Sequence, residues 1–387
     1  MRRFRALFWR IAAAAILLAG GWATWVRFTQ GLGAATHLSD RAPWGLWIGF
    51  DILCGVGLAA GGFAVTTAVY ILHIERLRPI VRPTILTAFL GYLLVVAALL
   101  FDLGRPWNIW RAVVLWNPHS VMFEVAWCVM LYSTVLALEF SPMLFERLGW
   151  RGAERAVKRA VVPLVGLGFL LSTLHQSSLG SLYLILPTKL HPLWYSPILP
   201  VLFWFSAVAA GLAMVIFESG LSARAFGRAL EFDLLQSVSK AMAVFLGLFL
   251  LLRFLDLAWR GALPQAFRLA GRGSYEAGMF WLETALLALP VALAALPRVR
   301  ANPQALFACS AVVVGGFLVN RLNVSTTGLD ASSGVRYFPS WMEIAVTMSI
   351  VVVGMNLFRL AARRLPVFHD ATRGPVEEQR PAAYAEP

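Results

Sequence analysis

The amino-acid sequence predicts an all-α protein that crosses a membrane about ten times. Of the 387 residues, 59% are hydrophobic and only 14% are charged, whereas a soluble domain has roughly 25% charged residues. The apolar residues run in continuous stretches of about 20, the length that a helix needs to span a bilayer. These observations exclude a soluble globular protein, a disordered chain and a nucleic-acid-binding protein. The continuous runs also exclude a β-barrel, whose strands alternate.

The candidate spans follow one another with short connections, which leave no room for a sizeable soluble domain. They cover residues 11–28, 45–73, 83–101, 120–140, 161–186, 197–218, 236–256, 279–297, 304–320 and 341–360. The first follows Met1-Arg2-Arg3-Phe4-Arg5, lacks a convincing small-x-small cleavage site and continues into Trp22, Trp25 and Arg27. We therefore interpret it as an uncleaved span and not as a signal peptide. The second carries glycines at positions 45, 49, 57 and 61, a stripe that predicts close helix packing.

The distribution of positive charge predicts the orientation of the chain. The formal net charge is +13, and with a cytoplasmic N-terminus 22 of the 33 Lys and Arg residues fall in cytoplasmic segments. By the positive-inside rule, both termini are expected in the cytoplasm. We expect one transmembrane domain over residues 1–364. Residues 365–387, rich in Pro, Ala and Glu, are expected to form a disordered cytoplasmic tail.

Ionisable side chains inside spans are costly and are functional candidates by default. They are Asp51, Glu124, Glu139, His175, Glu218, Arg253, Asp256, Glu283, Arg321 and Glu343. An acid near a helix N-terminus gains only about 0.3–1 kcal/mol from the helix dipole, less than burial of a charge can cost. This explanation fits Glu343 at the interface better than Glu124 and Asp51, which we expect to lie deeper. Glu139 and Glu218, near the inner ends of their spans, mark a candidate proton route together with Glu124.

His175 is the histidine expected well inside a span, in the polar stretch Ser172-Thr173-Leu174-His175-Gln176-Ser177-Ser178. Its polar neighbours indicate a hydrated or ligand-lined pocket. No second histidine matches its depth, so a haem held between two axial histidines is not expected. The three cysteines fall inside apolar spans without a C-x-x-C pair. We therefore expect no iron–sulfur cluster, no metal site and no disulfide in this chain.

Several segments together resemble the NrfD/polysulfide reductase C family, and most closely its HybB branch. They are Pro43-Trp44-Gly45-Leu46-Trp47, Phe101-Asp102-Leu103-Gly104-Arg105-Pro106-Trp107, Asn117-Pro118-His119-Ser120 and Asn320-Arg321-Leu322-Asn323. The resemblance extends from about Pro43 to Arg364. It implies two four-helix bundles plus flanking helices, without haem. It also implies a ferredoxin-like four-cluster iron–sulfur subunit on the periplasmic face, with the large and small subunits of a nickel–iron hydrogenase beyond it.

The same resemblance implies a quinone site near the outer face. Glu124, His175 and Glu218 match family positions tied to quinone or proton handling, and Asp51, Arg105 and Trp107 would lie near the pocket. We therefore expect a subunit that does not oxidise hydrogen itself but passes electrons to menaquinone. Glu124 and His175 are the expected catalytic proton donors. If Glu139 and Glu218 supply protons from the cytoplasm, the reaction is coupled to proton translocation.

Three alternatives stay open at this point. Intramembrane acids and a histidine also suit a secondary transporter, although transporter sites use broken helices near the midplane. A pure membrane anchor or assembly scaffold would need none of these residues. A chain of the same family could also serve a molybdenum-containing reductase in place of a hydrogenase, and only the neighbouring subunits distinguish these two.

Overall fold

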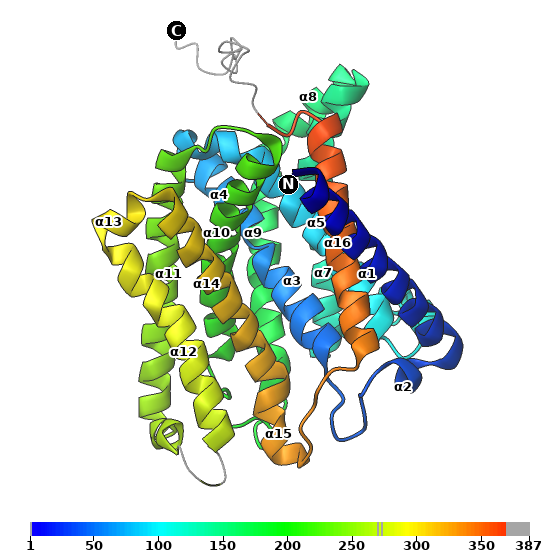
Figure 1. Cartoon of the computed structure of the whole chain (residues 1–387), viewed down its shortest axis with the longest axis vertical. Helices are drawn as coiled ribbons and strands as arrows, with labels where there is room; N and C mark the ends of the chain where they lie inside the picture. Colours follow the sequence, from blue (N-terminus) through cyan, green and yellow to red (C-terminus); the bar gives the residue numbers. More distant parts are fainter. Residues whose placement is uncertain (1, 269–270, 272–273, 369–387) are drawn as a thin grey trace.

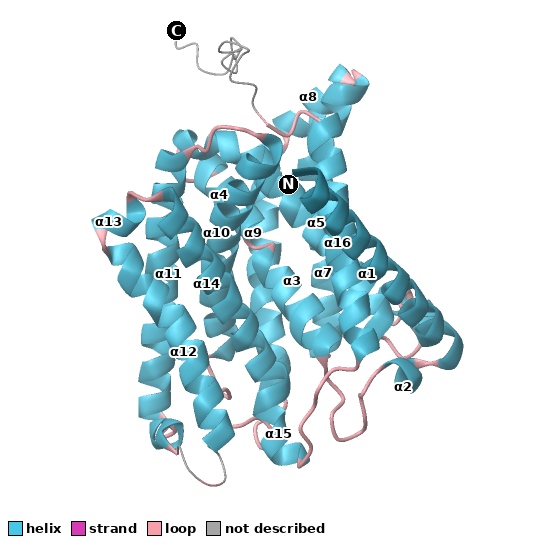
Figure 2. Ribbon diagram, viewed as in Figure 1, coloured by secondary structure: helices cyan, strands magenta, loops and turns pink. Residues whose placement is uncertain are grey.

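The computed structural model of the chain describes residues 2–268, 271 and 274–368, and its regular structure is helical (Figure 1, Figure 2). Within these residues, ten helices are long and apolar enough to cross a membrane. Each coincides with one of the predicted segments, so the prediction of an all-α, multi-pass membrane protein is confirmed.

The spanning elements are α1 (Arg2–Gln30), η1 (Trp47–Ile52) with α3 (Leu53–Leu58) and α4 (Gly61–Tyr70), α5 (Arg78–Asp102), α7 (Val121–Leu148), α9 (Val161–Leu184), α10 (Leu199–Phe226), α11 (Phe232–Trp259), α12 (Ser274–Ala295), α14 (Pro303–Leu322) and α16 (Trp341–Arg364). The shorter elements are α2 (Leu32–Ala35), η2 (Glu75–Leu77), η3 (Pro106–Asn108), α6 (Arg111–Val114), α8 (Arg151–Arg159), η4 (Leu263–Phe267), α13 (Pro297–Arg300), η5 (Asn323–Thr327) and α15 (Gly328–Ser333).

The spans form two four-helix bundles and a flanking pair, as the family resemblance implies. In the first bundle α4, α5, α7 and α9 pack in a ring, and in the second α10, α11, α12 and α14 do so. The bundles are joined where α10 packs against α4 and α9. The flanking helices α1 and α16 pack on each other and along α5, at the right of Figure 1.

The two ends of the molecule differ in their loops. Helix α1 begins and α16 ends at the same end, on which α8 also lies (Figure 1), and we call this end the α8 face. The opposite end carries α2, η3, α6, η4 and α15, and we call it the α15 face. Val367, which follows α16, is buried, and residues 369–387 of the predicted tail lie outside the described residues.

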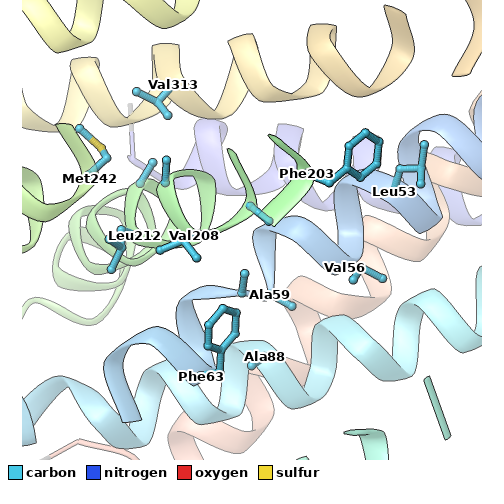
Figure 3. Packing of buried hydrophobic residues seen from close by; sticks show 14 of the residues in the cluster. Leu53, Val56, Ala59, Phe63, Ala88, Phe203, Val208, Leu212, Met242 and Val313 are labelled. Atoms are coloured by element: carbon cyan, nitrogen blue, oxygen red, sulfur yellow. The ribbon is translucent and has the colours of Figure 1, made fainter. Parts of the chain in front are cut away.

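The contact between the bundles depends on small residues, as the glycine stripe predicts. A methyl group on Gly61 of α4 would lie 2.6 Å from the carbonyl oxygen of Gly211 on α10, so only glycine permits this backbone approach. Buried side chains continue the contact, with Leu53 of α3 beside Phe203 of α10 (Figure 3). The close approach lets the two bundles share one core.

The second span is not a continuous α-helix. It begins with the π turn η1 and is interrupted between α3 and α4 at Ala59 and Ala60. Glycines surround the interruption, and glycine is a poor helix former. A second π turn, η5, continues α14 and packs against η1. Paired π turns distort two helices at the same level of the molecule, close to the α15 face.

The second bundle is built around a buried ion pair. The Glu283 side chain of α12 is fully buried and receives Arg253 of α11 as its ionic partner. Asn320 donates to its Oε1 at 2.7 Å, and Asn323 and Trp194 donate to its Oε2 at 2.8 and 2.9 Å. Because both carboxylate oxygens are saturated with donors, the charge of Glu283 is stabilised in place.

Replacing Gly211 with alanine is expected to destabilise the protein. In an ordinary helix interior this change stabilises by about 0.5–1 kcal/mol, but here the added methyl group meets the backbone of α4. We expect Gly211→Ala to lower the midpoint of thermal unfolding in detergent. The matched control is Gly166→Ala on α9, where nothing lies within 4 Å. If Gly211→Ala unfolds at a midpoint equal to or above that of the unsubstituted protein, the packing of α4 on α10 is contradicted.

Replacing Glu283 with glutamine leaves the Arg253 charge buried without its counter-ion. Breaking a buried ion pair on one side costs about 3–5 kcal/mol, and we expect a loss of that size in the free energy of unfolding. The double variant Glu283→Gln/Arg253→Met should recover part of this loss. The control is Glu154→Gln, which removes the Glu154–Lys158 pair at 2.7 Å on the surface of α8 and should cost less than about 1 kcal/mol. Additive losses in the double variant would refute the pairing.

Candidate functional site

The Glu124 carboxylate stands on an exposed flank of the first bundle. It lies in the first turn of α7, whose N-cap residue Ser120 accepts a hydrogen bond from the backbone N–H of Phe123 at 3.4 Å. The Ser178 hydroxyl on α9 donates to Glu124 Oε1. Glu124 is exposed on the surface of the chain, so its carboxylate combines one fixed partner with access from outside the bundle.

The His175 side chain is fully buried one turn away from Ser178 on α9. Its Nδ1 lies 2.9 Å from the hydroxyl of Tyr92 on α5, and the Tyr92 ring meets the Tyr132 ring of α7 edge to face at 4.7 Å. His175 Nε2 has no hydrogen-bond partner among the described residues. Residues three apart on a helix share one face, so His175 and the Ser178–Glu124 pair occupy neighbouring turns of the α7–α9 interface.

A cluster of aromatic rings adjoins Glu124 on the exposed flank. Trp116 lies 4.7 Å from Trp127 and 5.6 Å from Phe123, measured between ring centroids. The Trp127 indole N–H donates to the carbonyl oxygen of Ala112 at 2.9 Å, which ties the loop before α7 to the helix. We call Trp116, Phe123 and Trp127 the aromatic cluster. Flat rings beside a carboxylate offer both stacking and hydrogen bonding to a planar ligand.

No hydrogen bond between described residues connects Glu124 to Asp51, Arg105 or Trp107. Asp51 is buried in η1 and accepts from the Thr347 hydroxyl of α16 at 2.7 Å, so its partner belongs to the flanking pair. Arg105 and Trp107 lie exposed at η3 on the α15 face, where Trp107 is 67% accessible. Their expected place near a pocket stays a prediction.

The acids Glu124 and Glu343 both stand in the first turn of a span but differ in burial within the protein. Glu343 is fully buried, because it closes a capping box with Ser340 and also accepts the His37 backbone N–H at 3.0 Å and the Tyr337 hydroxyl. Burial, and next the Glu343 carboxylate, raise the pKa of Tyr337 in this loop. Loops that fold over the start of α16 thus enclose Glu343, whereas the start of α7 leaves Glu124 open.

The two acids of the expected proton route lie on different helices of the two bundles. Glu139 on α7 lines a cavity of about 180 Å³ at the α8 face, together with Tyr70 and Arg82. Glu218 on α10 accepts from the Thr87 hydroxyl of α5 at 2.5 Å. Between the levels of Glu139 and His175, the buried Tyr132 and Ser172 hydroxyls lie next to each other and have no further partner within the described part of the chain.

The polar stretch around His175 does not form a single pocket. Ser178 faces Glu124, Thr173 accepts from Trp204 of α10 at 3.2 Å, and Gln176 donates to the carbonyl oxygen of Val56 at 3.1 Å. Sequence reasoning also missed Tyr92 and Tyr132. A buried tyrosine hydroxyl needs a partner, so two tyrosines inside apolar spans were the available signal.

Several known proteins are similar to this chain over most of their length. A chain of Nitratidesulfovibrio vulgaris is 39% identical over 367 residues, 92% of this chain and 93% of that one. The probable Ni/Fe-hydrogenase 2 b-type cytochrome subunit of Escherichia coli K12 is 35% identical, over 88% of this chain and 87% of that one. The integral membrane subunit of menaquinone reductase of N. vulgaris is 29% identical, over 90% and 89%.

The name of the E. coli relative contradicts the prediction that this chain has no haem, because a b-type cytochrome is a haem protein. That prediction rested on histidine depth, which addresses only a haem held between two histidines inside the bundle. The described histidines do not form such a pair. His175 meets Tyr92, and the other four described histidines lie in loops or at helix ends, at positions 37, 73, 119 and 191. The described residues therefore do not fit a haem with two histidine ligands.

The family model described as "Polysulphide reductase, NrfD" matches residues 34–330, well over half of the chain. The match includes the start of the second span, the segment that closes α5 and the opening of α7, which carried the resemblance. Similarity to the hydrogenase subunit over nearly the whole chain fits the HybB branch. The chain therefore belongs to the NrfD family of polysulphide reductase membrane subunits.

Proposed function

We propose that the chain is the quinone-reactive membrane subunit of a nickel–iron hydrogenase complex that faces the periplasm. Two relatives support this proposal, since one is named as a subunit of Ni/Fe-hydrogenase 2 and the other as part of a menaquinone reductase. In this proposal the chain lies in the inner membrane of a bacterium. The α8 face, where α1 begins and α16 ends, is cytoplasmic, and the α15 face is periplasmic.

The observation that carries the proposal is the exposed Glu124 carboxylate at the start of an apolar span. Menaquinone is a lipid-soluble substrate that reaches the protein sideways from the bilayer. Glu124 is open on the flank of α7 and is held by Ser178. Beside it, the aromatic cluster offers faces on which a quinone ring can stack, with Trp116 66% accessible. A secondary transporter would instead need its site near the midplane.

The chemistry requires two electrons and two protons for each quinone reduced to quinol. Glu124 delivers a proton to the quinone oxygen nearest the flank, because a carboxyl group beside the substrate is a competent general acid. His175 is the second proton donor, oriented through Nδ1 by Tyr92 at 2.9 Å. Its Nε2 is buried and has no hydrogen-bond partner among the described residues. Two electrons come from the iron–sulfur partner subunit, which receives them from the hydrogenase subunits that oxidise hydrogen.

The partner's docking site is proposed at the α15 face. The loop around η3 and α6 exposes Trp107 and Trp110 between two cations, Arg105 and Arg111. Aromatic residues and arginine are enriched at protein interfaces. A ferredoxin-like four-cluster iron–sulfur subunit seated here would bring its electrons to the level of Glu124, with the large and small hydrogenase subunits beyond it.

Protons are proposed to be replaced from the cytoplasmic side. The cavity of about 180 Å³ opens Glu139 towards the α8 face, and it is large enough for several water molecules. The adjacent Tyr132 and Ser172 hydroxyls lie between Glu139 and His175 along α7 and α9. Glu218, with Thr87, provides a second acid at the inner side. Quinone reduction near the periplasm with protons from the cytoplasm would couple the reaction to charge movement.

Replacing Glu124 with glutamine keeps the size of the side chain but removes its proton. We expect hydrogen-dependent menaquinone reduction by the whole complex to fall by about 10²-fold or more, while hydrogen oxidation with an artificial dye stays unchanged. The control is Glu146→Gln at the other end of α7, where the carboxylate pairs with Arg82 at 2.9 Å. Menaquinone reduction at the normal rate in Glu124→Gln would reject the assignment of Glu124.

Purification of the chain in mild detergent tests which complex it serves. We expect an iron–sulfur subunit and a nickel–iron hydrogenase to travel with it, and to be lost when Trp107 and Trp110 are replaced by serine. Exposed Trp259 on α11, 84% accessible, supplies the control substitution. Co-purification of a molybdenum-containing reductase would keep the family assignment but overturn the hydrogenase partner. A chain that travels alone and takes up a solute would overturn the proposal.

A further inference from the structure

The second bundle contains a cavity at the α8 face, away from Glu124 and His175. It has a volume of about 220 Å³ and lies between the end of α10 and the starts of α11 and α14. Its inner wall is apolar and includes Ile216, Leu235 and Leu306. Arg224 and Arg228 stand at the same cavity, one turn apart on the last residues of α10 and the loop that follows.

The residues that line this cavity include two arginines and no carboxylate, and Glu231 stands between the lining residues Leu230 and Phe232. The Arg224 guanidinium is exposed and lies 4.6 Å above the Phe307 ring, and it forms no ion pair with a carboxylate of the described residues. Arg228 lies 4.2 Å above the Phe368 ring, which holds its guanidinium in place. The first residues of α11 and α14, Phe232 and Pro303, line the cavity. The positive ends of two helix dipoles are therefore added to the two cations.

The rim of the cavity lies at the level of the lipid headgroups along the membrane normal. The apolar span of α10 ends at Phe226, and those of α11 and α14 begin at Phe232 and Pro303. The rim of the cavity is therefore at the boundary of the hydrocarbon layer, and its apolar wall extends below that boundary. Gly220 contributes to this shape, because a methyl group there would lie 2.6 Å from the Phe307 ring.

We propose that this cavity binds an anionic phospholipid, with the phosphate between Arg224 and Arg228 and one acyl chain along the apolar wall. Guanidinium groups form strong, charge-assisted hydrogen bonds to phosphate oxygens. Basic pockets between spanning helices at the membrane surface are suited to anionic headgroups. Inorganic phosphate offers the same anionic chemistry but leaves the apolar wall of Ile216, Leu235 and Leu306 empty, so the shape of the cavity selects the lipid.

The test is a titration of the full chain in mild detergent, followed by native mass spectrometry. The probes are phosphatidylglycerol, phosphatidylcholine with the same acyl chains, and inorganic phosphate. We expect at least tenfold tighter binding of phosphatidylglycerol than of phosphatidylcholine. Arg224→Gln should weaken phosphatidylglycerol binding by about tenfold, the factor that 1.4 kcal/mol represents. Arg147→Gln, an exposed arginine at the end of α7 on the same face, should leave it unchanged.

A second variant separates the cavity from the surface charge. Ala223→Leu fills the cavity while both arginines remain, and it should also weaken phosphatidylglycerol binding. Undiminished binding to Ala223→Leu would overturn the proposal, as would equal affinity of the wild type for both lipids. The proposal would also be overturned if Arg147→Gln weakened phosphatidylglycerol binding as much as Arg224→Gln does. Competition by inorganic phosphate at the affinity of the lipid would identify a free-anion site and overturn the lipid assignment.

Discussion

The need to pair every ionisable group that is removed from water governs this molecule. In the second bundle the requirement is met for the Glu283 carboxylate, which is saturated by Arg253, Asn320, Asn323 and Trp194, while Arg253 Nη2 and Asn323 Oδ1 have no partner in the described structure. In the first bundle it is not, because His175 keeps an unpartnered Nε2 in the described structure and Glu124 has one hydroxyl partner on an open flank. Unpaired polar groups in an apolar bundle cost free energy. That cost is understandable where a substrate completes the pairing.

This contrast assigns different tasks to two similar bundles. The close approach of Gly61 and Gly211 joins them into one core, so the saturated bundle supports the open one. The ten spans provide two aqueous faces, and each carries a distinct set of groups. At the α15 face these are exposed tryptophans and the Glu124 flank, and at the α8 face they are the Glu139 cavity and the cavity at Arg224 and Arg228. A reaction that takes electrons from one face and protons from the other needs this division.

The spans, the helix packing through glycine and the set of intramembrane charges could all be predicted from the sequence, because each depends on local residue pattern. The partners of the charges could not. Glu124 and Glu343 both stand in the first turn of a span after a serine N-cap, yet only Glu343 is enclosed, by the loop that brings His37 and Tyr337. Tyr92 is tied to His175 across 83 residues of sequence, and nothing in the local pattern of α5 indicates that contact.

The most direct measurement is an experimental structure of the intact complex with menaquinone bound, at a resolution that locates the quinone ring. The central claim is that the ring lies at the α7–α9 interface of the first bundle. One oxygen should lie within hydrogen-bond distance of Glu124, and the ring should contact the aromatic cluster of Trp116, Phe123 and Trp127. A quinone ring in the second bundle near Glu283, or one held at the α8 face, would contradict the account.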